Sequence, residues 1–154
     1  MERKTGTGAL RGGMILGIGM DLIEVARVAR AFERLGDRFA RRFLLGRELD
    51  YCLGQARPAA HLAARFAAKE AVAKAFGTGI GSRLGWKDME IIRSESGQPH
   101  VELHGSGLEL FNERGGSSIW LSITHTQCHA SAMAVLEGCT GGPSTQQGRR
   151  PIST

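Results

Sequence analysis

The segment from residue 59 to residue 76 constrains the fold more than any other part of the chain. It reads AAHLAARFAAKEAVAKAF and is bounded by Pro58 and Gly77. Proline favours the first turn of a helix and glycine favours the position just after the last turn, so these boundaries predict one long helix. Alanine and other apolar residues fill most of its positions, which is typical of a helix packed into a core.

The charged residues inside this helix need an explanation. Glu70 has Phe66, Ala67, Ala73 and Lys74 as its neighbours one turn away, and three of these four are apolar. An exposed Glu70–Lys74 pair, worth about 0.3–0.5 kcal/mol, is one interpretation. The other is a carboxylate kept in an apolar setting for a counter-charge, such as a metal ion. The spacing by itself leaves both open.

Asp21 is a second carboxylate of this kind. It ends the segment MILGIGMD, residues 14–21, which predicts a short apolar strand interrupted by glycines. Asp21 is either a turn or N-cap residue of the helix expected from residue 22, or a metal ligand. Mg²⁺ is typically held by one or two protein carboxylates, with water and substrate phosphates completing its shell. Asp21 and Glu70 together therefore suit a metal-phosphate enzyme better than a structural metal site.

The rest of the pattern predicts an α+β domain. Helical spacing covers residues 22–35 and then residues 38–54, where Gly46 separates two short helices. Residues 87–105 predict two strands joined by a turn at SESGQP, and residues 106–115 a short helix with Ser106 as its N-cap. Residues 117–138 predict two further strands. We therefore expect helices followed by a small antiparallel sheet, with one domain per chain.

The charge distribution indicates the kind of partner. The chain has 154 residues, a net charge of +5 and a pI near 9.6, which suggests an RNA-binding protein as one hypothesis. Most of the excess lies in residues 1–13 and 138–154, which we expect to be disordered extensions of a domain at residues 14–137. Aromatic residues make up only 6%, too few for a base-stacking surface. Basic residues outnumber acidic ones within 14–74, which indicates an acidic partner or a solvated arginine-rich face.

Several other classes are disfavoured by the sequence. No window approaches the roughly 20 apolar residues of a membrane helix, and no apolar segment follows the charged N-terminus as in a signal peptide. The three cysteines are widely spaced and form no CxxC pair, which is typical of reduced cytoplasmic thiols. The segment GIGMDL fails the dinucleotide fingerprint, and FGTGIG follows a helix C-terminus rather than preceding an N-terminus. We expect a cytoplasmic protein that binds neither nucleic acid nor membrane.

Four strings occur in a fixed order between residues 14 and 137: GIGMDLIEVARV, RFAAKEAVAKAFGTGIG, GQP and SITH. In order and spacing they resemble the holo-[acyl-carrier-protein] synthases, the small bacterial 4'-phosphopantetheinyl transferases. The resemblance implies the 4'-phosphopantetheinyl transferase fold and transfer of 4'-phosphopantetheine from coenzyme A to a serine of apo acyl carrier protein. It further implies Mg²⁺ as cofactor, a role in fatty acid biosynthesis, and a homotrimer with its active sites between subunits.

The resemblance also implies roles for single residues. Asp21 and Glu70 match the family's metal ligands, which act together with phosphate oxygens of coenzyme A. Lys74 matches the lysine that stabilises the reacting phosphate or protonates its leaving group. His125, in SITH, matches a histidine near the coenzyme A pocket, and Arg27 matches an arginine that contacts the acidic carrier protein.

Other candidates follow from the residues themselves. Arg65 and Lys69 lie on the same predicted helix as Glu70. Phosphate contact is expected for both, with Lys69 facing the ligand. A loop as free of side chains as the one holding Gly77 and Gly79 can lie close against a ligand. The predicted coenzyme A-binding set is thus Arg65, Lys69, Lys74, Gly77, Gly79 and His125.

The general base is left open among a metal-bound water, Glu70 and His125. Without the family, His125 is interpreted as a structural histidine at a strand turn, and His61 as a structural or surface residue. A purely structural trimeric scaffold is a third hypothesis beside the enzyme and the RNA-binding protein, but it leaves the charged cluster on the helix unexplained.

Overall fold

A computed structural model describes residues 13–139 of the chain. The predictions for the two terminal segments fall outside these residues, apart from Gly13, Gly138 and Cys139, which lie in strands. Within the described part, no helix is long and apolar enough to cross a membrane.

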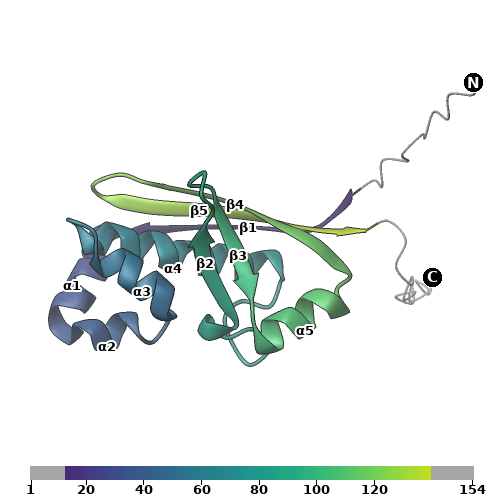
Figure 1. The fold of residues 1–154 in the computed structure, drawn as a ribbon, viewed down its shortest axis with the longest axis horizontal. Helices are drawn as coiled ribbons and strands as arrows, with labels where there is room; N and C mark the ends of the chain where they lie inside the picture. Colours follow the sequence, from purple (N-terminus) through teal and green to yellow (C-terminus); the bar gives the residue numbers. More distant parts are fainter. Residues whose placement is uncertain (1–12, 140–154) are drawn as a thin grey trace, which may run out of the picture.

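The architecture is a three-stranded antiparallel sheet with helices on one of its faces (Figure 1). The sheet order is β1-β5-β4, with β1 at Gly13–Glu24, β5 at His129–Cys139 and β4 at Gly116–His125. Helix α4, at Pro58–Ala75, confirms the long helix predicted from its boundaries, and it packs on this sheet. The fold is α+β, as expected, but the first strand pairs with the last, so the sheet joins the two ends of the domain.

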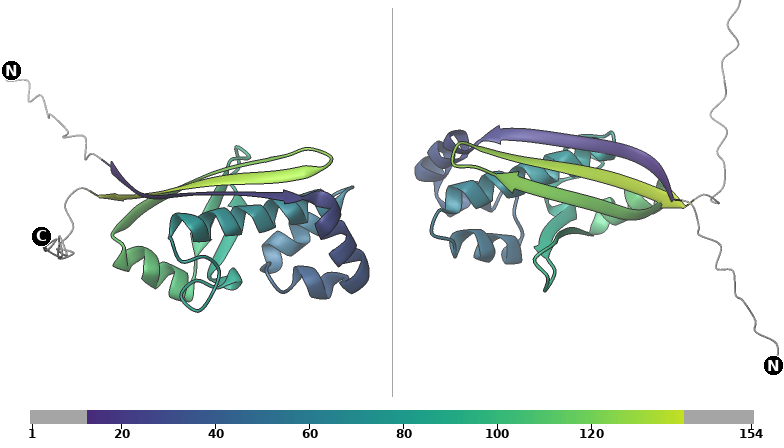
Figure 2. Two further views of the ribbon diagram at one scale, coloured as in Figure 1. Left: turned by 180° about the vertical axis from the view of Figure 1, so that it is seen from behind. Right: turned by 90° about the horizontal axis from the view of Figure 1, so that it is seen from above.

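The other elements cluster around α4 on the same side (Figure 2). Two short helices occupy this region as predicted, but residues 41–45 separate them and Gly46 is the first residue of the second helix; the turn at SESGQP joins two strands. The remaining elements are α1 (Val25–Leu35), α2 (Asp37–Ala40), α3 (Gly46–Leu53), η1 (Trp86–Asp88), β2 (Met89–Arg93), β3 (Pro99–Leu103) and α5 (Gly105–Glu113).

Two predicted boundaries were wrong. Strand β1 continues past residue 21 to Glu24, and Asp21 pairs with Ala132 of β5, so Asp21 is a strand residue and not a helix N-cap. Pairing with β5 overrides the local helical spacing at residues 22–24. Helix α5 has His104, not Ser106, at its N-cap position.

The contact between β1 and α4 depends on two glycines. A Cβ atom on Gly17 would lie 1.9 Å from the carbonyl oxygen of Ala75, and one on Gly19 would lie 1.9 Å from that of Ala71. No side chain fits at these distances, so glycine allows the helix backbone to rest directly on the strand. The buried residues of β5 that face the same helix are also mostly small: Ala130, Ala132, Ala134 and Leu136.

The opposite face of the sheet is apolar and exposed. Met20 is 64% exposed, and Met133, its partner across the β1–β5 ladder, is 46% exposed. Ile18 and Leu22 on β1 and Trp120 on β4 extend the same face. We call these five residues the outer sheet face. A contiguous apolar surface of this kind is typical of a protein–protein interface.

Candidate active site

Strand β1 and helix α4 bring three of the predicted site residues together. The Nζ atom of Lys74 donates hydrogen bonds to Oδ1 of Asp21 at 2.8 Å and to the carbonyl oxygen of Met20 at 3.1 Å. Glu70 lies one turn before Lys74 on α4 and is half-buried. Asp21 lies two residues after Gly19 and four after Gly17, so it is on the same face of β1 as these glycines and points toward α4.

The charges in this cluster favour a cation. Burial raises the pKa of the Glu70 carboxyl, and the negative charge of Asp21 raises it further, while Lys74 lowers it. Among the described residues Lys74 forms its ion pair with Asp21, so the interpretation of a simple Glu70–Lys74 surface pair was wrong. Two neighbouring carboxylates, one of them with a raised pKa, form an oxygen donor set that fits a divalent cation.

The loop that holds Gly77 and Gly79 caps the C-terminus of α4. Gly77 and Gly79 have φ angles of 71° and 63°, which favour glycine over residues with side chains. The backbone N–H of Gly79 donates to the carbonyl oxygen of Ala73 at 3.2 Å, which caps the helix C-terminus. A Cβ atom on either glycine would meet nothing within 4 Å, so the loop is open on its outer side, next to Lys74.

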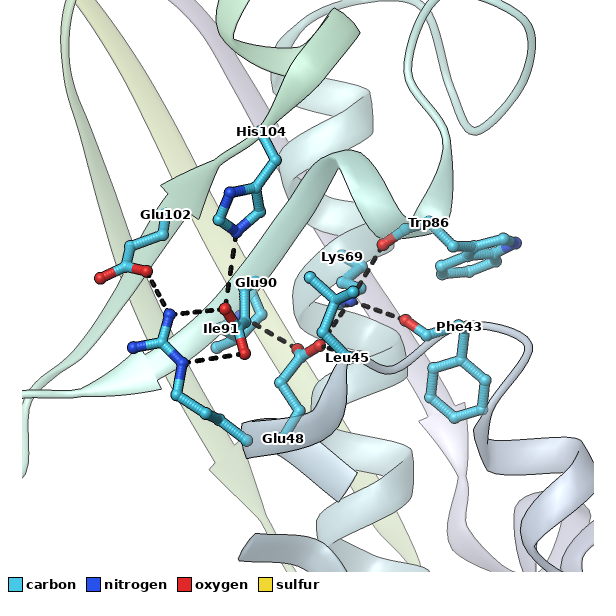
Figure 3. A network of polar contacts seen from close by, with 10 residues as sticks. Phe43, Leu45, Glu48, Lys69, Trp86, Glu90, Ile91, Glu102 and His104 are labelled. Atoms are coloured by element: carbon cyan, nitrogen blue, oxygen red, sulfur yellow. Dashed lines mark hydrogen bonds and ion pairs between the residues drawn. The ribbon is translucent and has the colours of Figure 1, made fainter. Parts of the chain in front are cut away.

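The prediction that Lys69 faces the ligand is wrong. Its side chain is fully buried, and its ammonium donates to Oε2 of Glu48 at 2.7 Å and to the carbonyl oxygens of Phe43 at 2.6 Å and Trp86 at 2.9 Å (Figure 3). Three bonds satisfy its three protons. Lys69 therefore connects α4 to α3, to the loop before α3 and to η1, and the helix rotation that buries it turns the next residue, Glu70, toward Asp21.

The same figure shows a second ion cluster beside Glu48. Arg47 donates to both oxygens of Glu90, at 3.1 and 2.6 Å, and also bonds to Glu102. The Nε2 atom of His104 lies 3.5 Å from Glu90. Although Glu90, Glu102 and His104 are spaced as metal ligands could be, Arg47 already supplies the positive charge between the two carboxylates. This cluster links α3 to the β2–β3 hairpin.

Arg65 and His125 lie on the other side of α4, beside β4. Both line a cavity of about 260 Å³, together with Arg93. His125 is exposed at the end of β4, and its ring centroid is 5.2 Å from that of His61 on α4. The two histidines also line a larger neighbouring cavity of about 770 Å³. His61 is a cavity residue that the sequence interpretation missed, because nothing in its spacing connects it to β4.

Arg27 is exposed on α1, as a residue contacting a partner must be. It lines a shallow groove with Arg30, Ala31 and Arg34. Arginines at these helical spacings lie on one face of α1, which gives this part of the surface a strong positive charge.

Comparison with known proteins identifies the family of this chain. Residues 17–132 match the model of the 4'-phosphopantetheinyl transferase superfamily. The holo-[acyl-carrier-protein] synthase of Koribacter versatilis is 42% identical over 124 residues, which are 80% of this chain and 99% of that protein. The crystal structure of the synthase from Neisseria meningitidis is 34% identical with a TM-score of 0.75, and covers 80% of this chain and 98% of that one.

A further crystal structure, that of the Helicobacter pylori synthase in complex with coenzyme A, is 31% identical with a TM-score of 0.70. It covers 77% of this chain and 98% of that one. The chain belongs to the 4'-phosphopantetheinyl transferase superfamily. The relatives described above are all holo-[acyl-carrier-protein] synthases, which confirms the resemblance and the fold class predicted from the four strings.

Proposed function

We propose that this protein transfers 4'-phosphopantetheine from coenzyme A to a serine of an apo acyl carrier protein, as a cytoplasmic Mg²⁺-dependent enzyme that serves fatty acid biosynthesis. In the reaction, the serine oxygen forms a bond to the β-phosphorus of coenzyme A, the pyrophosphate bond breaks, and adenosine 3',5'-bisphosphate leaves. The observation that carries the proposal is the meeting of Asp21, Glu70 and Lys74 where β1 rests on α4.

Asp21 and Glu70 would hold the magnesium ion. When bound there, Mg²⁺ would supply positive charge to the pyrophosphate oxygens. The raised pKa of the Glu70 carboxyl supports this role, because a partly desolvated carboxylate beside Asp21 is stabilised by a divalent cation.

Lys74 would act on the phosphate directly. Its side chain is 48% exposed, so the ammonium can turn from Asp21 to a phosphate oxygen without leaving the surface. A positive charge at this point stabilises the charge that develops on the leaving oxygen, and the ammonium can also donate a proton to it.

The base that takes the serine proton is left open among a metal-bound water, Glu70 and His125. The raised pKa of Glu70 brings it nearer the range of an effective general base, whereas His125 lies across α4 from Asp21.

Coenzyme A would contact both sides of α4. Lys74, Gly77 and Gly79 lie on the β1 side and its loop, whereas Arg65 and His125 lie on the β4 side, with β5 between the two strands. Within one chain α4 separates these two groups. We therefore propose a homotrimer, in which the β1 side of one subunit and the β4 side of the next form a complete site. The outer sheet face supplies the apolar surface that such an assembly buries.

The arginines of α1 would receive the carrier protein. Arg27, Arg30 and Arg34 form an exposed positive row near the start of the same helix-strand unit that holds Asp21. An acidic carrier protein is complementary to this row, and charge complementarity mainly raises the rate of encounter and orients the partner.

Intact mass spectrometry of the carrier protein tests the proposed function. The full-length protein is incubated with coenzyme A, Mg²⁺ and an apo acyl carrier protein, with Glu70→Ala and the exposed control Glu109→Ala in parallel. We expect the carrier to gain one 4'-phosphopantetheine group with the wild type and Glu109→Ala, and none with Glu70→Ala or with EDTA. Absence of the gain from folded wild-type protein with several carriers would contradict the proposal.

A further inference from the structure

One aromatic ring contacts two arginines from different elements. Tyr51 on α3, Arg65 on α4 and Arg93 on β2 all line the cavity of about 260 Å³ beside β4. The guanidinium carbon of Arg65 lies 4.8 Å from the centroid of the Tyr51 ring, and that of Arg93 lies 5.3 Å from the same centroid. Both distances are within the range of a cation–π interaction, so the ring attracts two like charges at once.

Neither of the two arginines is held by a carboxylate. Within residues 13–139, no ion pair joins Arg65 or Arg93 to an acidic side chain. Arg65 is only 4% exposed, and its Nε atom has no hydrogen-bond partner in the described part of the chain, whereas Arg93 is exposed at the end of β2. The Tyr51 ring therefore draws the two guanidiniums toward one place, against their mutual repulsion.

The packing of α3 on β2 fixes the place of Tyr51. Arg47 donates to both oxygens of Glu90 on β2, and the carboxylate of Glu48 accepts a hydrogen bond from a backbone N–H of the same strand at 3.0 Å. Tyr51 lies one turn after Arg47 on α3, and Arg93 lies three residues after Glu90 at the end of the strand. A side chain on a packed helix is a more precise support than one on a loop.

We propose that Tyr51 is a positioning residue for coenzyme A. Its ring keeps the guanidiniums of Arg65 and Arg93 together at the cavity, so that both present positive charge to the anionic part of the substrate. This rests on the proposed function, in which coenzyme A contacts Arg65. Tyr51 acts through the two arginines and does not itself need to touch the substrate. Without the ring, the exposed Arg93 turns toward water, and ordering its side chain again on binding lowers the affinity.

Binding and turnover together separate this role from a general structural one. The Kd for coenzyme A is measured by calorimetry, and kcat and KM by transfer to an apo acyl carrier protein, all with the full-length chain. Tyr51→Phe keeps the ring and should bind coenzyme A within about twofold of the wild type, whereas Tyr51→Leu should bind it about tenfold more weakly. In both variants, kcat at saturating coenzyme A and the KM for the carrier protein should change by less than about twofold.

Fluorinated phenylalanines at position 51 test the ring electrons alone. Each added fluorine weakens the negative face of the ring while its shape changes little. We expect the Kd for coenzyme A to rise stepwise from Tyr51→Phe through the forms with more fluorine, at nearly constant Tm. The same series at Phe111, which has no guanidinium over its ring among the described residues, should leave the Kd unchanged. This series does not depend on whether Tyr51→Leu folds.

Arg93→Ala removes one of the two charges that the ring holds. In this background the effect of Tyr51→Leu on the Kd should shrink by roughly half or more on a logarithmic scale, because the ring then positions Arg65 alone. Arg114→Ala, which removes an exposed charge after α5, is the control and should leave the effect of Tyr51→Leu at full size. An undiminished effect in the Arg93→Ala background would remove Arg93 from the proposal.

The outcomes separate the two proposals. A flat fluorine series, or a wild-type Kd for Tyr51→Leu, would overturn the role of Tyr51 while transfer to the carrier protein still supports the proposed function. Equal losses of affinity in Tyr51→Phe and Tyr51→Leu would assign the effect to the hydroxyl group and would also overturn positioning by the ring. If the wild type neither binds coenzyme A nor modifies the carrier protein, both proposals fail.

Discussion

The ammonium of Lys74 on helix α4 donates a 2.8 Å hydrogen bond to the carboxylate of Asp21 on strand β1. This bond joins residues 53 positions apart, and it exists because Gly17 and Gly19 let the helix backbone rest on the strand. A side chain at either glycine would separate the two elements and with them the predicted metal ligands.

Gly19→Ala tests this close contact. Its Cβ atom would lie 1.9 Å from the carbonyl oxygen of Ala71 and 2.5 Å from the backbone nitrogen of Ala75, so α4 must move. We expect a loss of about 1–3 kcal/mol in the free energy of unfolding, measured with urea, and a loss of transferase activity even where the variant is folded. Gly46→Ala, where a Cβ meets nothing within 4 Å, should unfold at nearly the wild-type urea concentration. Similar behaviour of the two variants would contradict the role given to Gly19.

Lys69→Met tests the buried ion pair. The substitution leaves the Glu48 carboxylate buried without its counter-charge, which typically costs about 3–5 kcal/mol. Adding Glu48→Gln to the same chain removes that charge, so the double variant should regain much of the lost stability in a double-mutant cycle. Breaking the exposed Arg83–Glu113 pair by Arg83→Ala should change the free energy of unfolding by at most about 1 kcal/mol. A small effect of Lys69→Met would show that the pair contributes little.

Glu70→Gln tests the charge conflict at the metal site. Because the folded-state pKa of Glu70 is raised, the folded protein binds more protons than the unfolded one between the ordinary and the raised pKa, and stability falls as pH rises through this window. In EDTA we expect the variant to melt at a higher temperature than the wild type at pH 7, with the difference vanishing near pH 4. Mg²⁺ should raise the Tm of the wild type and have little effect on that of the variant. Glu109→Gln, with an exposed carboxyl, should follow the wild type throughout; an equal Mg²⁺ effect on Glu70→Gln would contradict the assignment.

Arg27→Glu tests the carrier-docking face. Reversing one charge in the row on α1 should raise the KM for an acidic carrier protein by about tenfold, and it should weaken the dependence of kcat/KM on salt. The KM for coenzyme A should change little. Arg114→Glu, which reverses an exposed charge after α5, serves as the control and should leave the carrier KM near the wild-type value. Equal effects of the two reversals would indicate only a general loss of positive charge.

Met20→Glu tests the proposed trimer. A carboxylate in the middle of the outer sheet face would be buried without a partner in any assembly that covers this face. Light scattering coupled to gel filtration should show a trimer for the wild type and a monomer for Met20→Glu, with transferase activity lost because each site needs two subunits. Leu108 is an exposed apolar residue on α5, and Leu108→Glu should leave the mass of the assembly that of a trimer. A monomeric wild type with full activity would overturn the shared site.

The sequence determined the local elements and the family. Pro58 and Gly77 marked the ends of α4 because each has a strong preference for one helix terminus, and Gly46 marked the start of α3. The four strings predicted the family that the comparisons then confirmed. Asp21, Glu70 and Lys74 were named from their unusual setting and from the family motifs, and the structure brings them together.

Only the tertiary structure decided how these residues are used. The helical spacing of Lys69, Glu70 and Lys74 does not say which of them is buried, because that depends on the rotation of α4 against β1 and on the partner that Glu48 provides 21 residues away. Asp21 became a strand residue through its pairing with β5, and His61 joined a cavity through its contact with β4. Contacts between distant segments depend on strand register and helix packing, which local sequence preferences do not encode.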